Sequence, residues 1–214
     1  MSTPQKYLLF HIPKTGGTTI YKEFEQWVGR TRFKTYRRKF LPEALNGVTS
    51  ETLVINGHFD YMDLVSRLDL EEWRMIVWLR HPVNRVISNY HHFIRTLNNP
   101  HPKALDVAQK NAHRRQESLL EYCARDDNKN SMSKRLRGAK FNDFYFIGQQ
   151  ERLEADLIQL STRIGMPARE NVPFRNQGEY KKPSAEVLNQ LHKWNQEDLA
   201  MWNEWTRRLK EQQS

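Results

Sequence analysis

The sequence changes from a strand pattern to a helix pattern within one short stretch, Tyr7-Leu8-Leu9-Phe10-His11-Ile12-Pro13-Lys14-Thr15-Gly16-Gly17-Thr18-Thr19. Its first half, Tyr7 to Ile12, is a continuous apolar run, which is typical of a strand buried on both faces in a parallel sheet. Two adjacent glycines follow, and beyond them Ile20, Phe24 and Trp27 recur on one face of a helix. This order of elements predicts the first unit of an α/β fold.

The turn between this strand and this helix has the composition of a phosphate-binding loop. Glycines allow backbone N–H groups to converge on an anion, the helix N-terminus adds partial positive charge, and lysine and hydroxyl groups supply further donors. It is not a Walker A loop, because its lysine precedes the glycines. A tight turn with a solvated lysine is the alternative interpretation. The candidate phosphate-binding residues are Lys14, Thr15, Gly16, Gly17, Thr18 and Thr19.

Three further apolar runs have the length and composition of buried strands: Thr52–Asn56, Met75–Leu79 and Phe144–Ile147. Helical patterns begin at Pro82 and at Gln150. Strands that alternate with helices require crossover connections. The sequence therefore predicts an α/β fold with a P-loop-type central sheet that is mainly parallel and flanked by helices.

The rest of the chain is predicted to be helical, with a loop at 98–102 before a polar helical region at 104–137. Apolar residues recur at helical spacing over 184–211, which predicts one or two amphipathic helices that pack on the body. We expect a single domain over residues 1–214 with this helical C-terminal segment. Its apolar residues are Val187, Leu191, Trp194, Leu199, Trp202 and Leu209.

The composition is that of a soluble globular protein, with 38% hydrophobic and 28% charged residues among 214. No apolar run approaches the roughly 20 residues of a membrane helix, so we expect no membrane span. The net charge of +9 indicates either a surface for an anionic ligand or a solvated basic face. Basic residues cluster at Arg30, Arg32, Lys34, Arg37, Arg38 and Lys39, and again at Lys134, Arg135, Arg137 and Lys140.

The predicted strand at Met75–Leu79 is followed by Arg80-His81-Pro82, and Ser88 lies in the helix that comes next. An arginine at the carboxyl end of a strand lies at the edge where open α/β sheets bind ligands. Its guanidinium can make paired, charge-assisted hydrogen bonds to a terminal phosphate. Alone, an Arg-x-Pro helix start is commonplace and requires no ligand.

Another strand end carries Asn56-Gly57-His58. A Gly-His pair after a strand places an imidazole at the same edge as the phosphate-binding loop. Histidine is the side chain whose ordinary pKa is closest to neutral, so His58 is a candidate general base. A packing or capping role for this histidine is the alternative.

The first two motifs together resemble those of the superfamily of sulfotransferases that use 3′-phosphoadenosine-5′-phosphosulfate (PAPS). His11 to Thr18 match the family's His-Ile-Pro-Lys-Thr-Gly-Gly-Thr without a gap. The family's second motif, Arg-Asp-Pro followed by Arg and Ser, is matched except that His81 replaces the aspartate. The matching residues of this second motif are Arg80, Pro82, Arg85, Ser88 and Tyr90.

The resemblance is closest to the branch that sulfates heparan and other carbohydrates, and within it to the 2-O-sulfotransferases. Asn130–Gly138 resembles the segment before the fourth strand of those enzymes, and Phe146–Glu154 is similar to their Phe-Val-Gly-x-x-Glu-Arg-Phe-Glu. The 2-O group has a Gly-His at the place of His58, where the histidine is the base. The likeness extends over Tyr7 to Leu160 and is weak from Pro167 onward.

The resemblance implies an O-sulfotransferase that moves a sulfuryl group from PAPS to an acceptor hydroxyl of a carbohydrate and releases the bisphosphate PAP. Lys14 to Thr19 would hold the 5′-phosphosulfate, and Lys14 would also stabilise the leaving phosphate. Arg80 and Ser88 would hold the 3′-phosphate, and His58 would be the general base. We expect no nucleic-acid partner. Candidate contacts to the acceptor are Arg37, Arg38, Lys134 and Arg137.

Other functions fit parts of the sequence. A P-loop small-molecule kinase would need Gly-Lys-Ser/Thr and a strand-borne aspartate for magnesium, whereas the third predicted strand runs into Arg80. A non-catalytic basic module that binds nucleic acid or an acidic glycan would explain the charge but not the ordered motifs. A degenerate family member without turnover is opposed by the presence of Lys14, His58, Arg80 and Ser88.

No metal site is predicted, because His58 and Asp60 form an isolated pair and Cys123 is the only cysteine. A single cysteine excludes an intramolecular disulfide and fits a reducing compartment. We expect a cytoplasmic, bacterial protein, with a trimmed Golgi-lumenal catalytic domain as the alternative.

Overall fold

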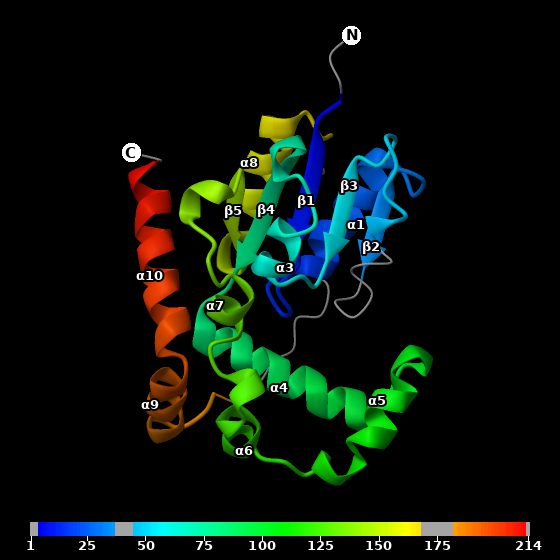
Figure 1. Ribbon diagram of the computed structural model, residues 1–214. Coiled ribbons are helices and arrows are strands. Elements are labelled where there is room, and N and C mark those ends of the chain that lie inside the picture. Colours follow the sequence, from blue (N-terminus) through cyan, green and yellow to red (C-terminus); the bar gives the residue numbers. More distant parts are fainter. Residues whose placement is uncertain (1–3, 37–44, 168–181, 213–214) are drawn as a thin grey trace.

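A five-stranded parallel sheet forms the centre of the computed structural model, which describes residues 4–36, 45–167 and 182–212 (Figure 1). The strand order is β2-β3-β1-β4-β5, and every neighbouring pair is parallel. The predicted α/β fold with a central parallel sheet is therefore confirmed. The strands are β1 (Lys6–Phe10), β2 (Phe33–Tyr36), β3 (Val54–Gly57), β4 (Trp73–Leu79) and β5 (Phe146–Gln149).

Strand β2 is not among the strands predicted from the sequence. Its sequence, Phe-Lys-Thr-Tyr, is short and lies within a basic stretch, and Phe33 is the residue of it that is buried. The strand forms an edge of the sheet beside β3, where polar side chains can face solvent and no long apolar run is needed. Part of the first basic cluster, including Lys34, therefore belongs to the sheet.

Helices flank the sheet, and short 3₁₀ turns connect several of them. The α-helices are α1 (Gly17–Val28), α3 (Tyr61–Val65), α4 (Pro82–Asn98), α5 (Leu105–Lys110), α6 (Leu119–Ala124), α7 (Ser131–Arg135), α8 (Leu153–Ile164), α9 (Ala185–Trp194) and α10 (Gln196–Glu211). The 3₁₀ turns are η2 (Leu70–Glu72), η3 (Pro102–Ala104), η4 (Ala112–Arg114), η5 (Asp126–Asn128), η6 (Phe141–Asp143) and η7 (Gln150–Arg152).

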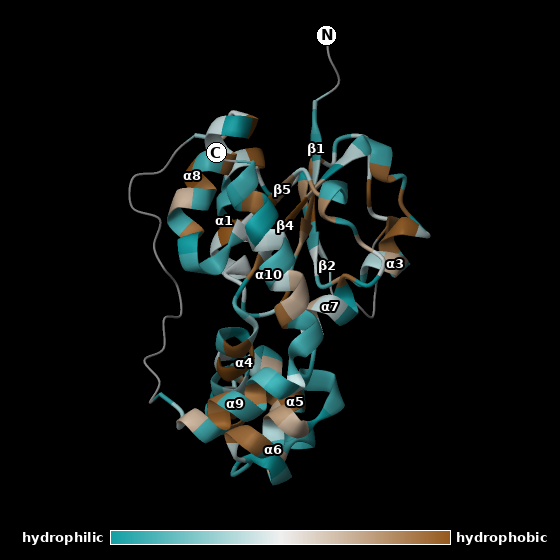
Figure 2. Ribbon diagram, turned by 90° about the vertical axis from the view of Figure 1, so that its left-hand side faces the viewer, coloured by the Kyte–Doolittle hydropathy of each residue, from teal (hydrophilic) through white to brown (hydrophobic). Residues whose placement is uncertain are grey.

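Two apolar cores cover the two faces of the sheet, because alternate strand residues point to opposite sides. On one face, Leu8 and Phe10 belong to a core shared with α3, α7 and α10. On the other face, Tyr7 and Leu9 belong to a core shared with α1 and α8. Figure 2 shows the hydrophobic strands between these two helical layers. Burial on both faces explains why the β1 run is apolar without interruption.

A further group of helices, α4, α5, α6 and α9, lies beyond the carboxyl ends of the strands (Figure 1). Val83 and Val86 of α4 form its core together with Tyr122 of α6 and Leu191 of α9. The loops that follow β1, β3 and β4 therefore end between the sheet and α4, at the edge where α/β sheets bind ligands. No helix within the described residues is long and apolar enough to cross a membrane.

Candidate functional site

The loop between β1 and α1 is held in a tight conformation by its own residues. Lys14 and Gly16 both have left-handed backbone angles, with φ of 73° and 91°. The buried Thr15 hydroxyl donates to the Ile12 carbonyl over 2.9 Å, so it closes the loop from inside. A lysine in the left-handed region costs on the order of 1–2 kcal/mol. Strain of this kind persists where the surroundings impose it, as they do at ligand-binding loops.

Helix α1 begins at the end of this loop with its positive end uncompensated. Gly16 is the N-cap residue, no described side chain caps the helix, and its first turn contains no acidic residue. Backbone N–H groups at such a terminus, together with the helix dipole, attract an anion. Thr18 is partly exposed there and Thr19 is buried. The loop and the helix start thus have the features that the sequence predicts for a phosphate cradle.

Gly17 allows the start of α1 to lie directly against the ring of His11. A Cβ atom added to Gly17 would lie 2.0 Å from His11 Nε2, with two further ring atoms at 2.1 and 2.6 Å. Real Cβ atoms do not approach other atoms this closely, so any side chain at Gly17 would displace either the helix start or the imidazole. The requirement for glycine here is one of space, whereas at Gly16 it is one of backbone angle.

His58 and His11 form a stacked pair beside the loop. Their ring centroids are 4.4 Å apart with planes inclined by 33°, and His58 Nδ1 lies 2.8 Å from the His11 carbonyl oxygen. The backbone N–H of His11 in turn donates to the Gly57 carbonyl over 2.9 Å. Because a carbonyl oxygen only accepts, Nδ1 of His58 carries a hydrogen, and in the neutral imidazole the lone pair then lies on Nε2. Nε2 is therefore the atom of His58 that can accept a proton.

His11 is held in its neutral form. Burial lowers its pKa to about 3, with smaller electrostatic contributions from His58, Arg135 and Lys14. A charged imidazole would lose its hydration in this position, so the neutral form is favoured. His11 is consequently uncharged at neutral pH.

Arg80, at the carboxyl end of β4, reaches the phosphate-binding loop. Its Nη1 donates to the Lys14 carbonyl over 3.2 Å. The next residue, His81, donates its backbone N–H to the Glu151 carboxylate over 2.9 Å, and burial lowers the pKa of its ring. These bonds bring the first two sequence motifs together, because Arg80 supports the loop that contains Lys14.

Lys14 lies among other positive charges. Its pKa is lowered to about 8, first by burial and then by Arg95 and Arg80. Arg95 was not singled out by the sequence motifs, although it lies on α4 seven residues after Ser88 and so faces a similar direction. The same two cations, Lys14 and Arg95, contribute after burial to a lowered pKa of His92. A cluster of like charges at a loop of this shape favours the binding of an anion.

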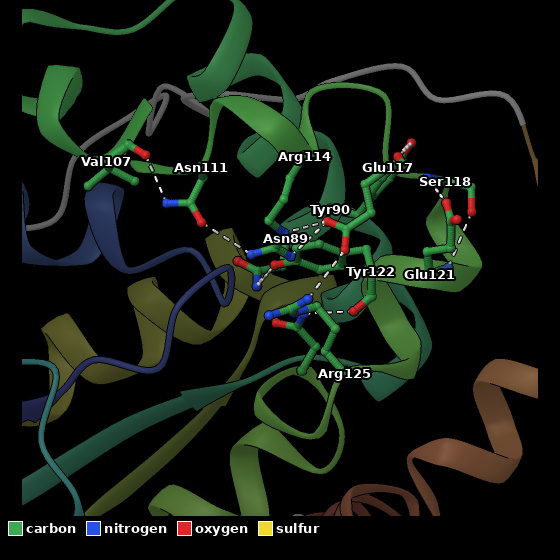
Figure 3. A network of polar contacts seen from close by, with 11 residues as sticks. Asn89, Tyr90, Val107, Asn111, Arg114, Glu117, Ser118, Glu121, Tyr122 and Arg125 are labelled. Atoms are coloured by element: carbon green, nitrogen blue, oxygen red, sulfur yellow. Dashed lines mark hydrogen bonds and ion pairs between the residues drawn. The ribbon is translucent and has the colours of Figure 1, made fainter. Parts of the chain in front are cut away.

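Ser88 is buried in α4, on a helix that makes polar contacts with Glu117 and with Tyr122 of α6. Its neighbour Asn89 donates to the Tyr122 hydroxyl over 2.7 Å. Tyr90 donates to the Glu117 carbonyl over 3.0 Å, and the Glu117 carboxylate pairs with Arg114 at 2.7 Å. Figure 3 shows these side chains gathered between α4 and the segment 107–125. The contacts restrain the part of α4 that carries Ser88.

The basic residues proposed from the sequence as acceptor contacts lie in different surroundings. Arg37 and Arg38 are outside the described residues. Lys134 and Arg137 are exposed, and the Lys134 ammonium group donates to the Asp126 carbonyl over 2.6 Å. Arg135, between them in sequence, instead contacts the Phe59 carbonyl and the Asp60 carboxylate. The sequence gives no signal that distinguishes these three basic residues, because the difference arises from how α7 packs.

The described side chains bring together an anion cradle and a proton acceptor at one sheet edge. Lys14, Arg80 and the start of α1 are the candidate groups for the cradle, and Nε2 of His58 is the candidate acceptor. Such a pairing suits the transfer of an anionic group to a hydroxyl, whose proton must be removed. Within the part of the chain that the structure describes, no group of three His, Cys, Asp or Glu side chains could hold a metal ion.

A family model described as "Sulfotransferase family" matches residues 1–209, and no curated protein matches the sequence. Three solved structures are similar. A sulfotransferase from Alicyclobacillus acidocaldarius is 13% identical, with 94% of each chain covered and a TM-score of 0.45. Mouse sulfotransferase SULT7A1, complexed with PAP, is 15% identical over 79% of this chain and 60% of its own, with a TM-score of 0.44. Retinol dehydratase, in a complex with retinol and PAP, is 14% identical over 90% and 81%, with a TM-score of 0.38.

Proposed function

The chain belongs to the sulfotransferase family, and from this premise we propose that it transfers a sulfuryl group from PAPS to a hydroxyl group of a carbohydrate, with His58 as the general base. PAP would be the second product. The observation that carries the proposal is the 2.8 Å contact between His58 Nδ1 and the His11 carbonyl. It leaves Nε2 with a lone pair at the edge of the phosphate-binding loop.

The donor would occupy the loop and the start of α1. Lys14, Thr18 and the first N–H groups of α1 would contact the 5′-phosphosulfate, because they combine positive charge with converging donors. Arg80 and Ser88 would hold the 3′-phosphate. The 5′-phosphosulfate and the 3′-phosphate would then bind at two separate places along the same edge of the sheet. Arg95 adds positive charge near Lys14 and would strengthen the binding of either group.

In the chemical step, the acceptor oxygen attacks sulfur as its proton moves to Nε2 of His58. The new oxygen–sulfur bond forms while the bond from sulfur to the bridging oxygen of PAPS breaks, and the electron pair stays with the departing 5′-phosphate. Lys14 and the N–H groups of α1 stabilise this developing charge in place. A carbohydrate acceptor is supported by the resemblance of Asn130–Gly138, Phe146–Glu154 and the Gly-His pair to carbohydrate O-sulfotransferases.

Calorimetric titration with PAP, beside ATP with magnesium, tests the donor site. We expect PAP to bind tightly and ATP weakly. Arg80→Ala should weaken PAP binding about 10- to 100-fold, because a hydrogen bond to a charged group contributes roughly 1.5–3 kcal/mol. Arg207→Ala is the matched control, since Arg207 is an exposed arginine on α10 that pairs with Glu211. Preference for magnesium-ATP would favour a kinase, and no nucleotide binding by folded protein would favour a basic binding module.

Release of PAP from PAPS in the presence of different acceptors tests the second half of the proposal. The acceptors would be a heparosan oligosaccharide, a neutral oligosaccharide such as maltotriose, and a simple phenol. Transfer to a sugar is the expected result. Transfer to the phenol alone would contradict the carbohydrate assignment while leaving sulfuryl transfer in place.

A further inference from the structure

Helix α10 holds the short helix α7 through a buried carboxylate. Asp198 is 0% exposed, and its two oxygens accept the backbone N–H groups of Met132 (3.1 Å) and Ser133 (2.7 Å). These N–H groups belong to the first turn of α7, where they have no partner within the helix. The N-terminal cap of α7 therefore comes from a helix more than sixty residues later in the chain.

Asn130, the residue before α7, is held by residues at the start of α10. Asn130 has a left-handed backbone, with φ of 49°. Its N–H donates to the Asn195 side-chain oxygen over 3.2 Å, and its own side-chain oxygen accepts from the N–H of Asp198 at 3.4 Å. We call Asn130, Asn195 and Asp198 the polar clasp. Because each member is bonded to another chain segment, α7 cannot shift without breaking several hydrogen bonds, one of them fully buried.

The polar clasp also connects to α4. Arg85 is 1% exposed, and the negative charge of Asp198 favours its charged form against the cost of burial. A buried carboxylate and a buried guanidinium each require such compensation. Arg85 lies on α4, the helix that also carries Ser88, so the charge of Asp198 acts on α4 as well as on α7.

The other end of α7 reaches the residues that follow His58. Arg135 Nη1 lies 3.4 Å from the Phe59 carbonyl oxygen and 3.5 Å from Asp60 Oδ1. Both side chains of the ion pair are about four-fifths buried, with 20% and 21% of their surface exposed, so the contact is shielded from water. Its charge is also felt by His11, the partner of His58.

We propose that Arg135 is a positioning residue for His58, and that the polar clasp of the C-terminal helices determines where Arg135 lies. The turn from Gly57 to Asp60 is then fixed on both sides, by His11 at His58 Nδ1 and by Arg135 at the next two residues. The inference rests on the proposed function for the role of His58. It makes α10 a part of the functional site through its bonds to α7.

Arg135→Gln tests this arrangement, with Arg135→Lys as the conservative variant and Arg207→Gln as the matched control. In the PAPS assay with heparosan oligosaccharide, we expect Arg135→Gln to lower kcat roughly 10- to 100-fold, because small displacements of a catalytic group have effects of this size. PAP affinity should stay within about twofold of the wild type, since Arg135 contacts Phe59 and Asp60 and not the phosphate-binding loop. Arg135→Lys should recover part of the loss, and Arg207→Gln should match the wild type.

The tautomer of His58 provides a measurement that does not depend on any acceptor. In nitrogen-15 spectra of histidine-labelled protein, the wild type should show His58 with its hydrogen on Nδ1, assigned by loss of the signal in His58→Gln. Arg135→Gln should change this signal toward an average of the two tautomers. An unchanged His58 signal in Arg135→Gln would overturn this inference, whatever the protein's activity. Absence of sulfuryl transfer in the assay would instead refute the proposed function.

Asn130→Gly tests the polar clasp without disturbing the buried charges. Glycine adopts the left-handed angle of Asn130 freely, so the backbone should persist while the bond to the N–H of Asp198 is lost. We expect kcat to fall by a few-fold, between the values of Arg207→Gln and Arg135→Gln, with PAP affinity retained. A wild-type kcat for Asn130→Gly would show that the polar clasp does not set the position of Arg135.

For Arg135→Gln, a loss of PAP affinity as large as the loss of kcat would place Arg135 at the donor instead, and would contradict its role as a positioning residue for His58.

Discussion

His58 and His11 are joined twice, once by the 2.8 Å contact from His58 Nδ1 to the His11 carbonyl and once by their stacked rings. His11 is also the residue that leads β1 into the phosphate-binding loop, three residues before Lys14. The proposed proton acceptor therefore contacts the same segment of backbone that forms the proposed anion cradle. Their relative position is fixed by covalent geometry and two short contacts, which is the kind of preorganisation that group transfer requires.

Replacing His58 should separate catalysis from donor binding. His58→Gln removes the proton acceptor but keeps a side-chain donor near the His11 carbonyl. We expect the rate of sulfuryl transfer to fall about 100-fold or more, which is the usual contribution of a general base. PAP affinity, measured by calorimetry, should be unchanged. A variant that retains wild-type turnover would show that another group accepts the proton.

Replacing Gly17 should show how tightly the two histidines and α1 are packed. Gly17→Ala would place a Cβ atom 2.0 Å from the His11 ring. We expect a loss of about 1–3 kcal/mol in the free energy of unfolding, which is typical of overpacking in a filled site. Urea unfolding measures this loss. If the clash is the cause, the double variant with His11→Ala should recover part of the stability lost in Gly17→Ala, because the added methyl group then has room.

Much of the fold follows from local sequence, but part of the site does not. The β1 run, the glycine turn and the α1 pattern lie within one stretch, so strand, loop and helix could be predicted together. Strand β2 could not, because an edge strand with polar residues such as Lys34 has no distinct apolar pattern. The place of Arg135 beside Phe59 depends on α7 and on Asp198, which lie far apart in the sequence. Contacts of that kind arise only when the chain is folded.

The affinity for PAP should decrease above pH 8. Burial and the neighbouring arginines lower the pKa of Lys14 to about 8, so the unliganded protein loses this positive charge as the pH rises through that value. An anion favours the charged form, and the phosphates of PAP are already ionised above pH 7. Calorimetry should show affinity falling by up to about tenfold per pH unit above pH 8. Lys14→Arg should bind with little dependence on pH over the same range, because an arginine stays charged. Affinity that is flat to pH 10 in the wild type would contradict contact between Lys14 and the ligand.

Acidification should destabilise the fold through His11. Its folded pKa is about 3 and its ordinary value is 6.5, so between these values the unfolded chain binds a proton that the folded chain excludes. The free energy of unfolding therefore falls as the pH is lowered from 6.5 toward 3, by up to about 1.4 kcal/mol per pH unit for one such proton. His11→Asn removes this titration, and its loss of packing lowers stability at every pH. Urea unfolding of both proteins at pH 7.5 and pH 4.5 gives the change in the free energy of unfolding between these pH values. Comparing that change in wild type and His11→Asn cancels the titration of the carboxylates that both proteins share. We expect the wild type to lose more stability than the variant between these two pH values. An equal loss in both proteins would mean that His11 becomes protonated in the folded state, and it would no longer be the neutral wall against which the His58 ring is stacked.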